Sequence, residues 1–289
     1  MDETTARRRP EALLLLARAA LQEDVGRADV TSLLTVTKET RARARFVAKE
    51  DLVVSGIEAA RAVFYEAGGE ELAFAAPADE GDRVTTGTAL AEVEGPARPI
   101  LAAERVALNL VMRLSGVATV TSRYVEAVAG TGASITDTRK TTPGLRLLEK
   151  AAIRAGGGTN HRAGLDDGVL IKDNHLALAG GVAEAVRRAR AGAPHLLKVE
   201  VEVESPGMLE EALRAGADAV LLDNMTPEEV RRCIRLVREK STGVLVEVSG
   251  GVNLETVRRY AEAGPNLISV GALTHSAPAG DVSLEVEPC

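Results

Sequence analysis

Short apolar runs in the second half of the chain are followed by charged residues or glycines. Six such groups occur in order: Asp137-Thr138-Arg139-Lys140, Lys172-Asp173-Asn174-His175, Glu200 with Glu202, Asp223-Asn224, Ser249-Gly250-Gly251, and Gly271. In α/β barrels, the carboxyl ends of the strands and the loops after them build the active site. We therefore expect these groups to face one common site.

The candidate site is rich in cations. Its basic members are Arg105, Arg139, Lys140, His161, Arg162 and Lys172, and its acidic members are Glu202 and Asp223. Because the whole chain has a net charge of −7, this local excess of positive charge predicts a substrate with several negative charges. The two acids suit a divalent metal ion or ribose hydroxyls. The glycines at the last two strand ends suit a phosphate held by backbone N–H groups.

One strand has its acids inside the apolar run itself. In the stretch VEVEVE, Glu200 and Glu202 lie on the same strand face, because side chains alternate along a strand. One or both must point inward, which costs free energy without a cation or a hydroxyl partner. A solvated rim of the protein does not need acids in such positions.

Each candidate residue also has a structural interpretation. An isolated arginine is most often part of a surface ion pair. Arg139 and Arg162, however, stand in glycine-containing loops and not on exposed helical faces. His161 taken alone favours a structural role, and its place between Asn160 and Arg162, after three glycines, makes it a site candidate. Glycines without such neighbours predict only tight turns.

Repeated strand–helix units position these residues. Apolar runs such as ADAVLLDN alternate with amphipathic stretches such as TPEEVRRCIRLVREK, which predicts a parallel sheet with crossover helices. The clear strands are fewer than a complete eight-stranded barrel requires, which favours an incomplete barrel. The first third mixes a helix with short strand-like runs, and the tail GDVSLEVEPC predicts a strand that returns to this region.

Composition limits the classes of function. At 289 residues and 45% hydrophobic, the chain can bury one large core or two smaller ones. The net charge of −7 argues against general affinity for nucleic acid or an anionic membrane.

No stretch is long and apolar enough to span a bilayer, and the run before Gly26 predicts an amphipathic helix, since Arg18 interrupts it. Cys233 and Cys289 predict neither a disulfide nor a metal site, which suits a cytoplasmic protein.

Longer motifs occur in a fixed order along the chain: ERVALNLVMRLSGVAT, DTRKTTPGLR, GGGTNHRAGLDDGVLIKDNH, VEVE, LLDNM, SGGVN and VGALTHS. Together they resemble the quinolinate phosphoribosyltransferases. The specific part is DTRKTTPGLR followed by GGGTNHR and LIKDNH, whereas SGG or VGAL alone is weak. The resemblance implies an N-terminal α/β sandwich domain over residues 1–112 and an incomplete, TIM-like parallel α/β barrel over 113–275. The strand over 276–289 is expected to return to the first domain. Met112 and Ala151 depart from the pattern and bear on packing.

The resemblance also implies an activity and a set of site residues. The enzyme would transfer phosphoribosyl from phosphoribosyl pyrophosphate to quinolinate, releasing pyrophosphate and carbon dioxide and giving nicotinate mononucleotide for NAD biosynthesis. The implied substrate-binding residues are Arg105, Thr138, Arg139, Lys140, His161, Arg162, Lys172, Glu202, Asp223, Ser249, Gly250, Gly251 and Gly271. Lys140, His161, Glu202 and Asp223 form the implied catalytic subset.

Individual roles follow from the same resemblance. Glu202 and Asp223 would lie near the ribose hydroxyls and Mg²⁺, the implied cofactor, with Glu202 favoured over Glu200. Lys140 would neutralise pyrophosphate, and either Lys140 or His161 would assist decarboxylation. The family is implied to work as a homodimer in which Arg105 reaches the partner's site.

Three other interpretations fit parts of the pattern. A relative with another acceptor, such as nicotinate, is the nearest, but a single carboxylate would leave cations unpaired at a cost of about a few kcal/mol. A barrel lyase or aldolase would use Lys172 as a Schiff-base lysine. A non-catalytic phosphate-binding scaffold is the third, and the filled charged positions argue against it.

Overall fold

The chain forms two compact units. The computed structural model describes residues 3–240 and 243–289, with the backbone alone for residues 3–10. Unit 1 comprises Met1–Val120, Pro143–Gly156 and Ala277–Cys289, and unit 2 comprises Thr121–Thr142 and Gly157–Ser276. These units are groups of residues in mutual contact, so the domain boundaries predicted from the sequence stay predictions.

Unit 1 is built on an antiparallel sheet. Its four strands lie in the order β12 (Val282–Pro288), β1 (Arg41–Ala48), β5 (Ala89–Pro96) and β3 (Ala73–Ala75). The sequence RARARFVA of β1 alternates arginine with alanine or phenylalanine, so one face of the strand is buried and the other exposed. Phe46 of β1 packs edge-on against Phe64 of helix α3 (Ile57–Gly68), with ring centroids 5.9 Å apart. This contact fixes the helix on the buried face of the sheet.

The other elements of unit 1 are mostly helical. They are α1 (Glu3–Val25), α2 (Val30–Thr35), a short 3₁₀ turn (Gly69–Glu71), the small pair β2 (Leu52–Val53) and β4 (Arg83–Val84), α5 (Arg146–Ala155), and most of α4 (Ala97–Ala127). Arg113 of α4 pairs at 2.7 Å with Glu149 of α5, whose side chain is fully buried. This ion pair holds α5 within unit 1 although neighbouring residues belong to unit 2.

Unit 2 contains a parallel sheet of six strands. Their order is β6 (Ser134–Thr136), β11 (Leu267–Ser269), β10 (Leu245–Ser249), β9 (Ala219–Asp223), β8 (Val199–Val203) and β7 (Val169–Ile171). Strands β6 and β7 are the two edges, so the barrel is not closed. The expected α/β fold with an incomplete parallel barrel is confirmed.

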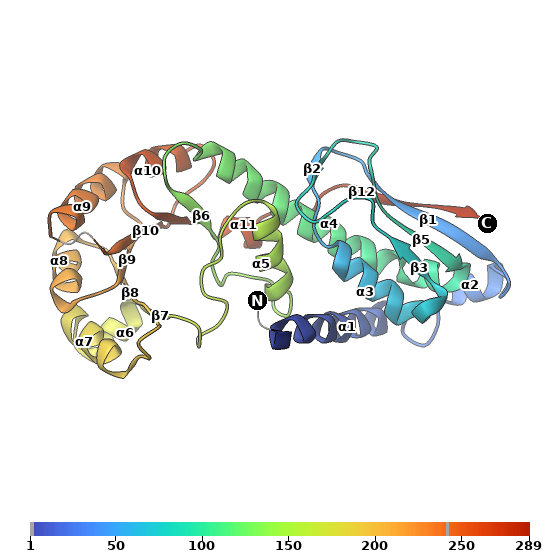
Figure 1. Ribbon diagram of the computed structural model, residues 1–289, viewed down its shortest axis with the longest axis horizontal. Helices are drawn as coiled ribbons and strands as arrows, with labels where there is room; N and C mark the ends of the chain where they lie inside the picture. Colours follow the sequence, from blue (N-terminus) through green and yellow to red (C-terminus); the bar gives the residue numbers. More distant parts are fainter. Residues whose placement is uncertain (1–2, 241–242) are drawn as a thin grey trace. The chain divides into compact units, whose positions relative to one another are not determined.

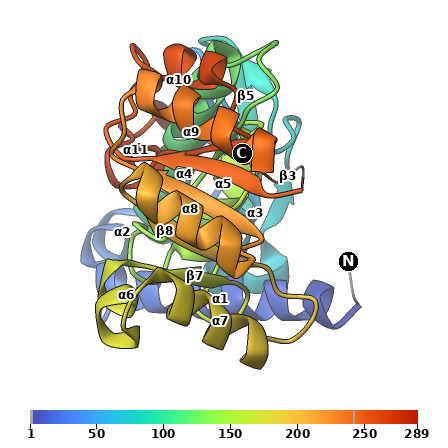
Figure 2. The same ribbon diagram turned by 90° about the vertical axis from the view of Figure 1, so that its left-hand side faces the viewer.

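Helices cover the outer side of this sheet. Figures 1 and 2 show α7 (Val182–Gly192), α8 (Pro206–Ala215), α9 (Pro227–Lys240) and α10 (Val257–Ala263) outside the strands that they connect. The short helices α6 (Asp173–Ala179) and α11 (Ala272–His275) follow β7 and β11 directly. The strands are rich in valine, leucine and isoleucine, and in β8 and β10 these residues alternate with glutamate. In the part of the chain that is described, each helix is too short or too polar to cross a bilayer.

The C-terminal segment approaches α4 at a glycine. A Cβ atom on Gly116 would lie 1.9 Å from the carbonyl oxygen of Pro278, and Gly280 N–H donates to the carbonyl oxygen of Met112 at 2.8 Å. The backbone of residues 278–280 therefore contacts the helix surface where any larger side chain would collide.

Replacing Gly116 with alanine is expected to destabilise unit 1. The added methyl group must push residues 278–280 away from α4, which costs about 3 kcal/mol. Gly192→Ala is the control, because Gly192 is also a helical glycine, the last residue of α7, but has open space around its Cβ position. Thermal unfolding should show a lower Tm for Gly116→Ala and an unchanged or slightly higher Tm for Gly192→Ala. Equal Tm values would contradict the close approach.

Candidate active site

The register of the parallel sheet places several acids on one face. Glu202 of β8 is level with Leu221 of β9, and Leu221 is level with Glu247 of β10. Glu200 and Asp223 share this face, since each stands two residues from a member of the row. A buried face with four carboxylates requires cations, protons or polar partners close by.

Two arginines lie close enough for the charge of one to act on the other, and neither forms an ion pair within the described residues, although the charges of Asp167 and Glu200 also act on Arg162. Arg139 follows β6, and Arg162 stands in the segment 157–168 between α5 and β7. The Nε atoms of both are buried and donate to no acceptor among the described residues. Arg162 Nη1 donates to the carbonyl oxygen of Gly168 at 3.0 Å. Burial, and then the positive charge of Arg139, lower the pKa of Arg162. Two buried guanidinium donors of like charge are a ready site for an anion.

The segment that holds Arg162 is attached beside β6. Thr159 forms a parallel bridge with Thr136 and donates from its backbone N–H to Ile135 at 2.8 Å. Asp137, which is fully buried, accepts from Asn160 Nδ2 at 2.7 Å and from the backbone N–H of His161 at 2.8 Å. The aspartate in the motif DTRK therefore fixes the loop that begins NHR.

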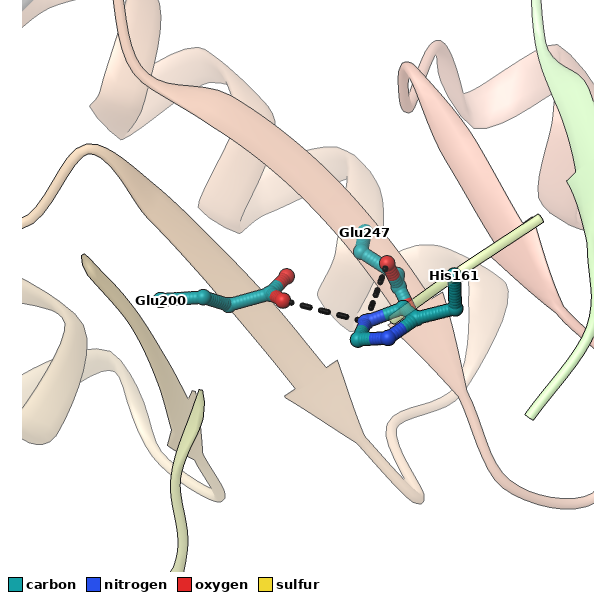
Figure 3. Close-up of side chains that lie close together, drawn as sticks. All are labelled: His161, Glu200 and Glu247. Carbon is teal, nitrogen blue, oxygen red and sulfur yellow. Dashed lines mark hydrogen bonds and ion pairs between the residues drawn. The ribbon is translucent and has the colours of Figure 1, made fainter. Parts of the chain in front are cut away.

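His161 lies between two glutamates (Figure 3). Its Nε2 is 3.2 Å from Glu200 Oε2 and 3.5 Å from Glu247 Oε2. Its Nδ1 accepts the backbone N–H of Arg162 at 2.8 Å, so the ring is neutral in this arrangement, with its proton on Nε2. The hydrogen bond with Glu200 raises the pKa of His161, as do the charges of both glutamates, against burial and the charge of Arg162.

Glu247 is the most deeply buried acid of this cluster. It is 2% exposed, and neither carboxylate oxygen makes a hydrogen bond of ordinary geometry with the described residues. Burial, followed by the charge of Glu200, raises the pKa of Glu247 to about 7. The carboxyl group therefore holds a proton near neutral pH much more readily than an exposed glutamate does.

Lys172 and Glu202 form an ion pair at the ends of neighbouring strands. Lys172 follows β7, and its Nζ donates to Glu202 Oε2. Glu202 also lines a small cavity of about 200 Å³ together with Asp173, Leu176, Glu204 and Met208. The lysine that was predicted to bind a substrate carboxylate thus has a carboxylate of the protein beside it.

Asp223 and the glycine turn after β10 are joined by Asn224. Asn224 has a φ of 53°, and among the described residues no other non-glycine residue has a positive φ. Its Nδ2 donates to Asp223 Oδ2 at 2.7 Å, and its backbone N–H donates to Ser249 at 3.0 Å. A Cβ on Gly250 would lie 2.2 Å from Asn224 Oδ1, which explains the glycine. Asp223 and Ser249-Gly250 are therefore held as one unit.

Lys140 lies beside the last glycine of the predicted set. Its backbone N–H donates to Thr138 Oγ1 at 3.1 Å, and its carbonyl oxygen accepts from Thr274 Oγ1 at 2.9 Å. A Cβ on Gly271 would lie 3.1 Å from Lys140 Cδ. The order β6–β11 in the sheet brings these two residues together. Lys140 is exposed, as expected for a group that meets a ligand from solvent.

Unit 2 thus contains all the predicted site residues except Arg105. Arg105 is an exposed residue of α4 in unit 1. A second, largely apolar cavity of about 760 Å³ lies within unit 1 between α1, α3 and α5, and none of the predicted residues lines it. The contacts that bring the unit 2 residues together agree with a shared site, whereas their roles stay predictions.

The sequence-based prediction did not include Glu247. Its signal was the same as that of Glu200 and Glu202, an acid inside an apolar strand, here LVEVS. Asp137 was noted as part of a polar group, but its role in fixing residues 160 and 161 was not.

Glu247→Gln is expected to change how stability depends on pH. Because the folded-state pKa of about 7 exceeds the ordinary 4.5, the folded protein binds a proton that the unfolded chain releases, and stability falls as pH rises through this window. The raised pKa of His161 acts in the same direction. Urea denaturation measures the free energy of unfolding at each pH. In the wild type this free energy should be lower at about pH 7.5 than at about pH 5 by on the order of 2 kcal/mol, and in Glu247→Gln the difference should be clearly smaller. The same fall in both proteins would refute the assignment.

Comparison with known proteins gives one consistent family. A model of the N-terminal domain of quinolinate phosphoribosyl transferase matches residues 29–115, and a model of the C-terminal domain matches residues 117–285. A probable nicotinate-nucleotide pyrophosphorylase (carboxylating) of Bacillus subtilis is 43% identical over 267 residues, which are 91% of this chain and 90% of the relative. The nicotinate-nucleotide pyrophosphorylase (carboxylating) of Mycobacterium leprae is 42% identical and covers 93% and 95% of the two chains.

Solved structures agree with this result. NadC from Streptococcus pyogenes has a TM-score of 0.89 at 40% identity, covering 95% of this chain and 96% of the other. The nicotinate-nucleotide pyrophosphorylase from Francisella tularensis has a TM-score of 0.90 at 36% identity, covering 96% and 97%. The chain therefore belongs to the quinolinate phosphoribosyltransferase family.

Proposed function

We propose that the protein transfers the phosphoribosyl group of phosphoribosyl pyrophosphate to quinolinate and releases pyrophosphate and carbon dioxide. The product is nicotinate mononucleotide, a precursor of NAD. One observation supports this proposal most directly. The adjacent Arg139 and Arg162 have buried Nε donors without acceptors among the described residues, in a chain of this family.

The arginine pair favours a dicarboxylate over a monocarboxylate. Each guanidinium group binds one carboxylate well with two parallel hydrogen bonds. Quinolinate has two carboxylates on adjacent ring carbons, whereas nicotinate has one. A monocarboxylate would leave one desolvated guanidinium without a counter-charge, at a cost of about a few kcal/mol. Lys172 and Arg105 complete the proposed quinolinate site, and His161 supports it from the protein side through its contact with the backbone of Arg162.

The proposed site for phosphoribosyl pyrophosphate lies at the ends of β8 to β11. Ser249, Gly250, Gly251 and Gly271 would hold its phosphate by backbone N–H groups, and Thr138 and Lys140 would face the pyrophosphate. Glu202 and Asp223 would contact the ribose hydroxyls. These two carboxylates also suit Mg²⁺, which prefers oxygen ligands. The metal ion would neutralise charge on the pyrophosphate.

The chemistry then depends on placing charge. As pyrophosphate leaves with the bonding electron pair, the anomeric carbon becomes electron-poor, and the pyridine nitrogen attacks it from the opposite face. Lys140 stabilises the charge that develops on the leaving group, and the arginine pair holds the ring in line. The pyridinium nitrogen then accepts electron density when the adjacent carboxylate is lost as carbon dioxide, and one proton replaces it on carbon.

The structure favours Lys140 over His161 as the source of that proton. Both ring nitrogens of His161 already face protein groups, Nδ1 the backbone N–H of Arg162 and Nε2 the two glutamates. The exposed side chain of Lys140 is open to a ligand. His161 then acts by shaping the site.

A homodimer in the cytoplasm is part of the proposal. Arg105 is exposed, which leaves it available to reach the site of a partner chain. Cys233 and Cys289 are both free thiols, which suits a reducing compartment.

Incubation with quinolinate, phosphoribosyl pyrophosphate and magnesium tests the activity. Carbon dioxide and nicotinate mononucleotide are expected to form with quinolinate and not with nicotinate in a parallel sample. Turnover of nicotinate alone, or no turnover of quinolinate by protein that binds phosphoribosyl pyrophosphate, would overturn the proposal.

Arg139→Ala and Arg162→Ala are expected to lower kcat/KM for quinolinate by about 100-fold each, because each removes a charge-assisted contact to a carboxylate. The KM for phosphoribosyl pyrophosphate should change by less than about threefold. Arg187→Ala is the matched control, since Arg187 forms an exposed ion pair with Glu184 on α7. Steady-state kinetics with each substrate varied in turn distinguishes these results. A uniform rise in both KM values would speak against carboxylate binding by the arginines.

Mixing two inactive variants tests the dimer. In a homodimer with a shared site, Arg105→Ala and Lys172→Ala chains that exchange subunits form one intact site per mixed dimer, giving about a quarter of the wild-type activity. Each variant alone should stay nearly inactive. Absence of recovery after confirmed subunit exchange would place Arg105 and Lys172 in the same site of one chain, or Arg105 outside the site.

A further inference from the structure

Glu200 and Glu247 approach the same atom of His161. The distances from Nε2 are 3.2 Å to Glu200 Oε2 and 3.5 Å to Glu247 Oε2, and the three side chains come from β8, β10 and the segment after α5 (Figure 3). Within the described residues, the two oxygens and the nitrogen all lie within 4.8 Å of one another. One imidazole and two carboxylates this close together form a candidate metal site.

The hydrogen bonding of His161 argues against a metal there. A metal on Nε2 requires the ring proton to stand on Nδ1. Nδ1, however, faces the backbone N–H of Arg162 at 2.8 Å, and two donors cannot share that contact. The proton therefore belongs on Nε2, where it is donated to Glu200 with Glu247 beside it. Both ring nitrogens of His161 therefore have hydrogen-bond partners in the protein, Glu200 at Nε2 and the backbone N–H of Arg162 at Nδ1.

The hydrogen bonds of the His161 cluster extend to the backbone of Arg162. The backbone N–H bound to Nδ1 belongs to the residue whose guanidinium Nε is buried without an acceptor. The backbone N–H of His161 is held by Asp137, on the other side of the segment. The contact of the ring with the two glutamates thus fixes the position of the Arg162 backbone, from which the Arg162 side chain extends. Two cations act on the cluster: the charge of Arg162 lowers the pKa of His161, and the charge of Lys172 lowers the pKa of Glu247.

We propose that Glu200 and Glu247 are positioning residues which, acting through His161, hold Arg162 in the orientation that receives a quinolinate carboxylate. This inference rests on the proposed function. Both glutamates face His161 Nε2, so their proposed effect on the substrate is indirect. Their loss should weaken quinolinate binding and leave binding of phosphoribosyl pyrophosphate nearly unchanged, since the latter depends on residues at the ends of β8 to β11 and not on Arg162.

Steady-state kinetics of Glu247 variants tests the proposal. Glu247→Met keeps the volume but removes the polar group, and it is expected to raise the KM for quinolinate about tenfold, because a small displacement of a binding group is costly. Glu247→Gln keeps an oxygen acceptor and should rescue the KM to within about twofold of the wild type. Val246→Ala is the control for a weakened β10, since Val246 is buried on the opposite strand face. It should lower Tm and leave the ratio of the two KM values unchanged.

A double-variant cycle tests the route through His161. If Glu247 acts through the ring, Glu247→Met should add no further rise in KM to His161→Asn. Additive effects, equal rises in both KM values for Glu247→Met, or failure of Glu247→Gln to rescue would overturn the proposal. Stoichiometric metal in the purified wild type that Glu247→Met loses would overturn it as well. Lack of quinolinate turnover by the wild type itself would instead refute the proposed function, so the two failures are distinguishable.

Discussion

The candidate site depends on two guanidinium groups of like charge, those of Arg139 and Arg162, whose Nε donors are buried. Each has a buried Nε donor without an acceptor among the described residues, and the charge of one lowers the pKa of the other. This arrangement is unfavourable in the free protein and becomes favourable when an anion with two negative groups binds. The loops that contain the arginines must therefore be held by strong contacts of their own.

The acids of the unit 2 sheet supply those contacts. Asp137 fixes the segment before Arg162 through Asn160 and the backbone of His161. Glu200 and Glu247 approach the His161 ring from β8 and β10, and the ring accepts the N–H of Arg162. Because burial raises the pKa of Glu247 to about 7, this carboxyl group carries less negative charge near neutral pH than an exposed glutamate would.

The repeated strand–helix units predicted a parallel sheet, and the small number of clear strands predicted an incomplete barrel. The charged ends of the apolar runs predicted a shared site, because strand ends of a parallel sheet meet at one edge. This pattern also grouped the residues that the structure brings together, such as Lys172 with Glu202 and Asp223 with the turn at Gly250. Side-chain contacts between different strands could not be predicted, because they depend on the order and register of the strands, which the local sequence does not encode. Glu247 was missed for this reason, although the single acid within LVEVS gave a signal. The tautomer of His161 follows only from the position of one backbone N–H.

A crystal structure of the protein with quinolinate would show whether Arg139 and Arg162 bind its two carboxylates. We expect the two carboxylates to bind at unit 2, with at least one oxygen within hydrogen-bond distance of Nε of Arg139 and one within that distance of Nε of Arg162. We also expect the His161 ring to stay on Glu200 and Glu247 in the complex. Quinolinate bound elsewhere, with both Nε donors still lacking an acceptor, would contradict the claim that this arginine pair is the carboxylate site.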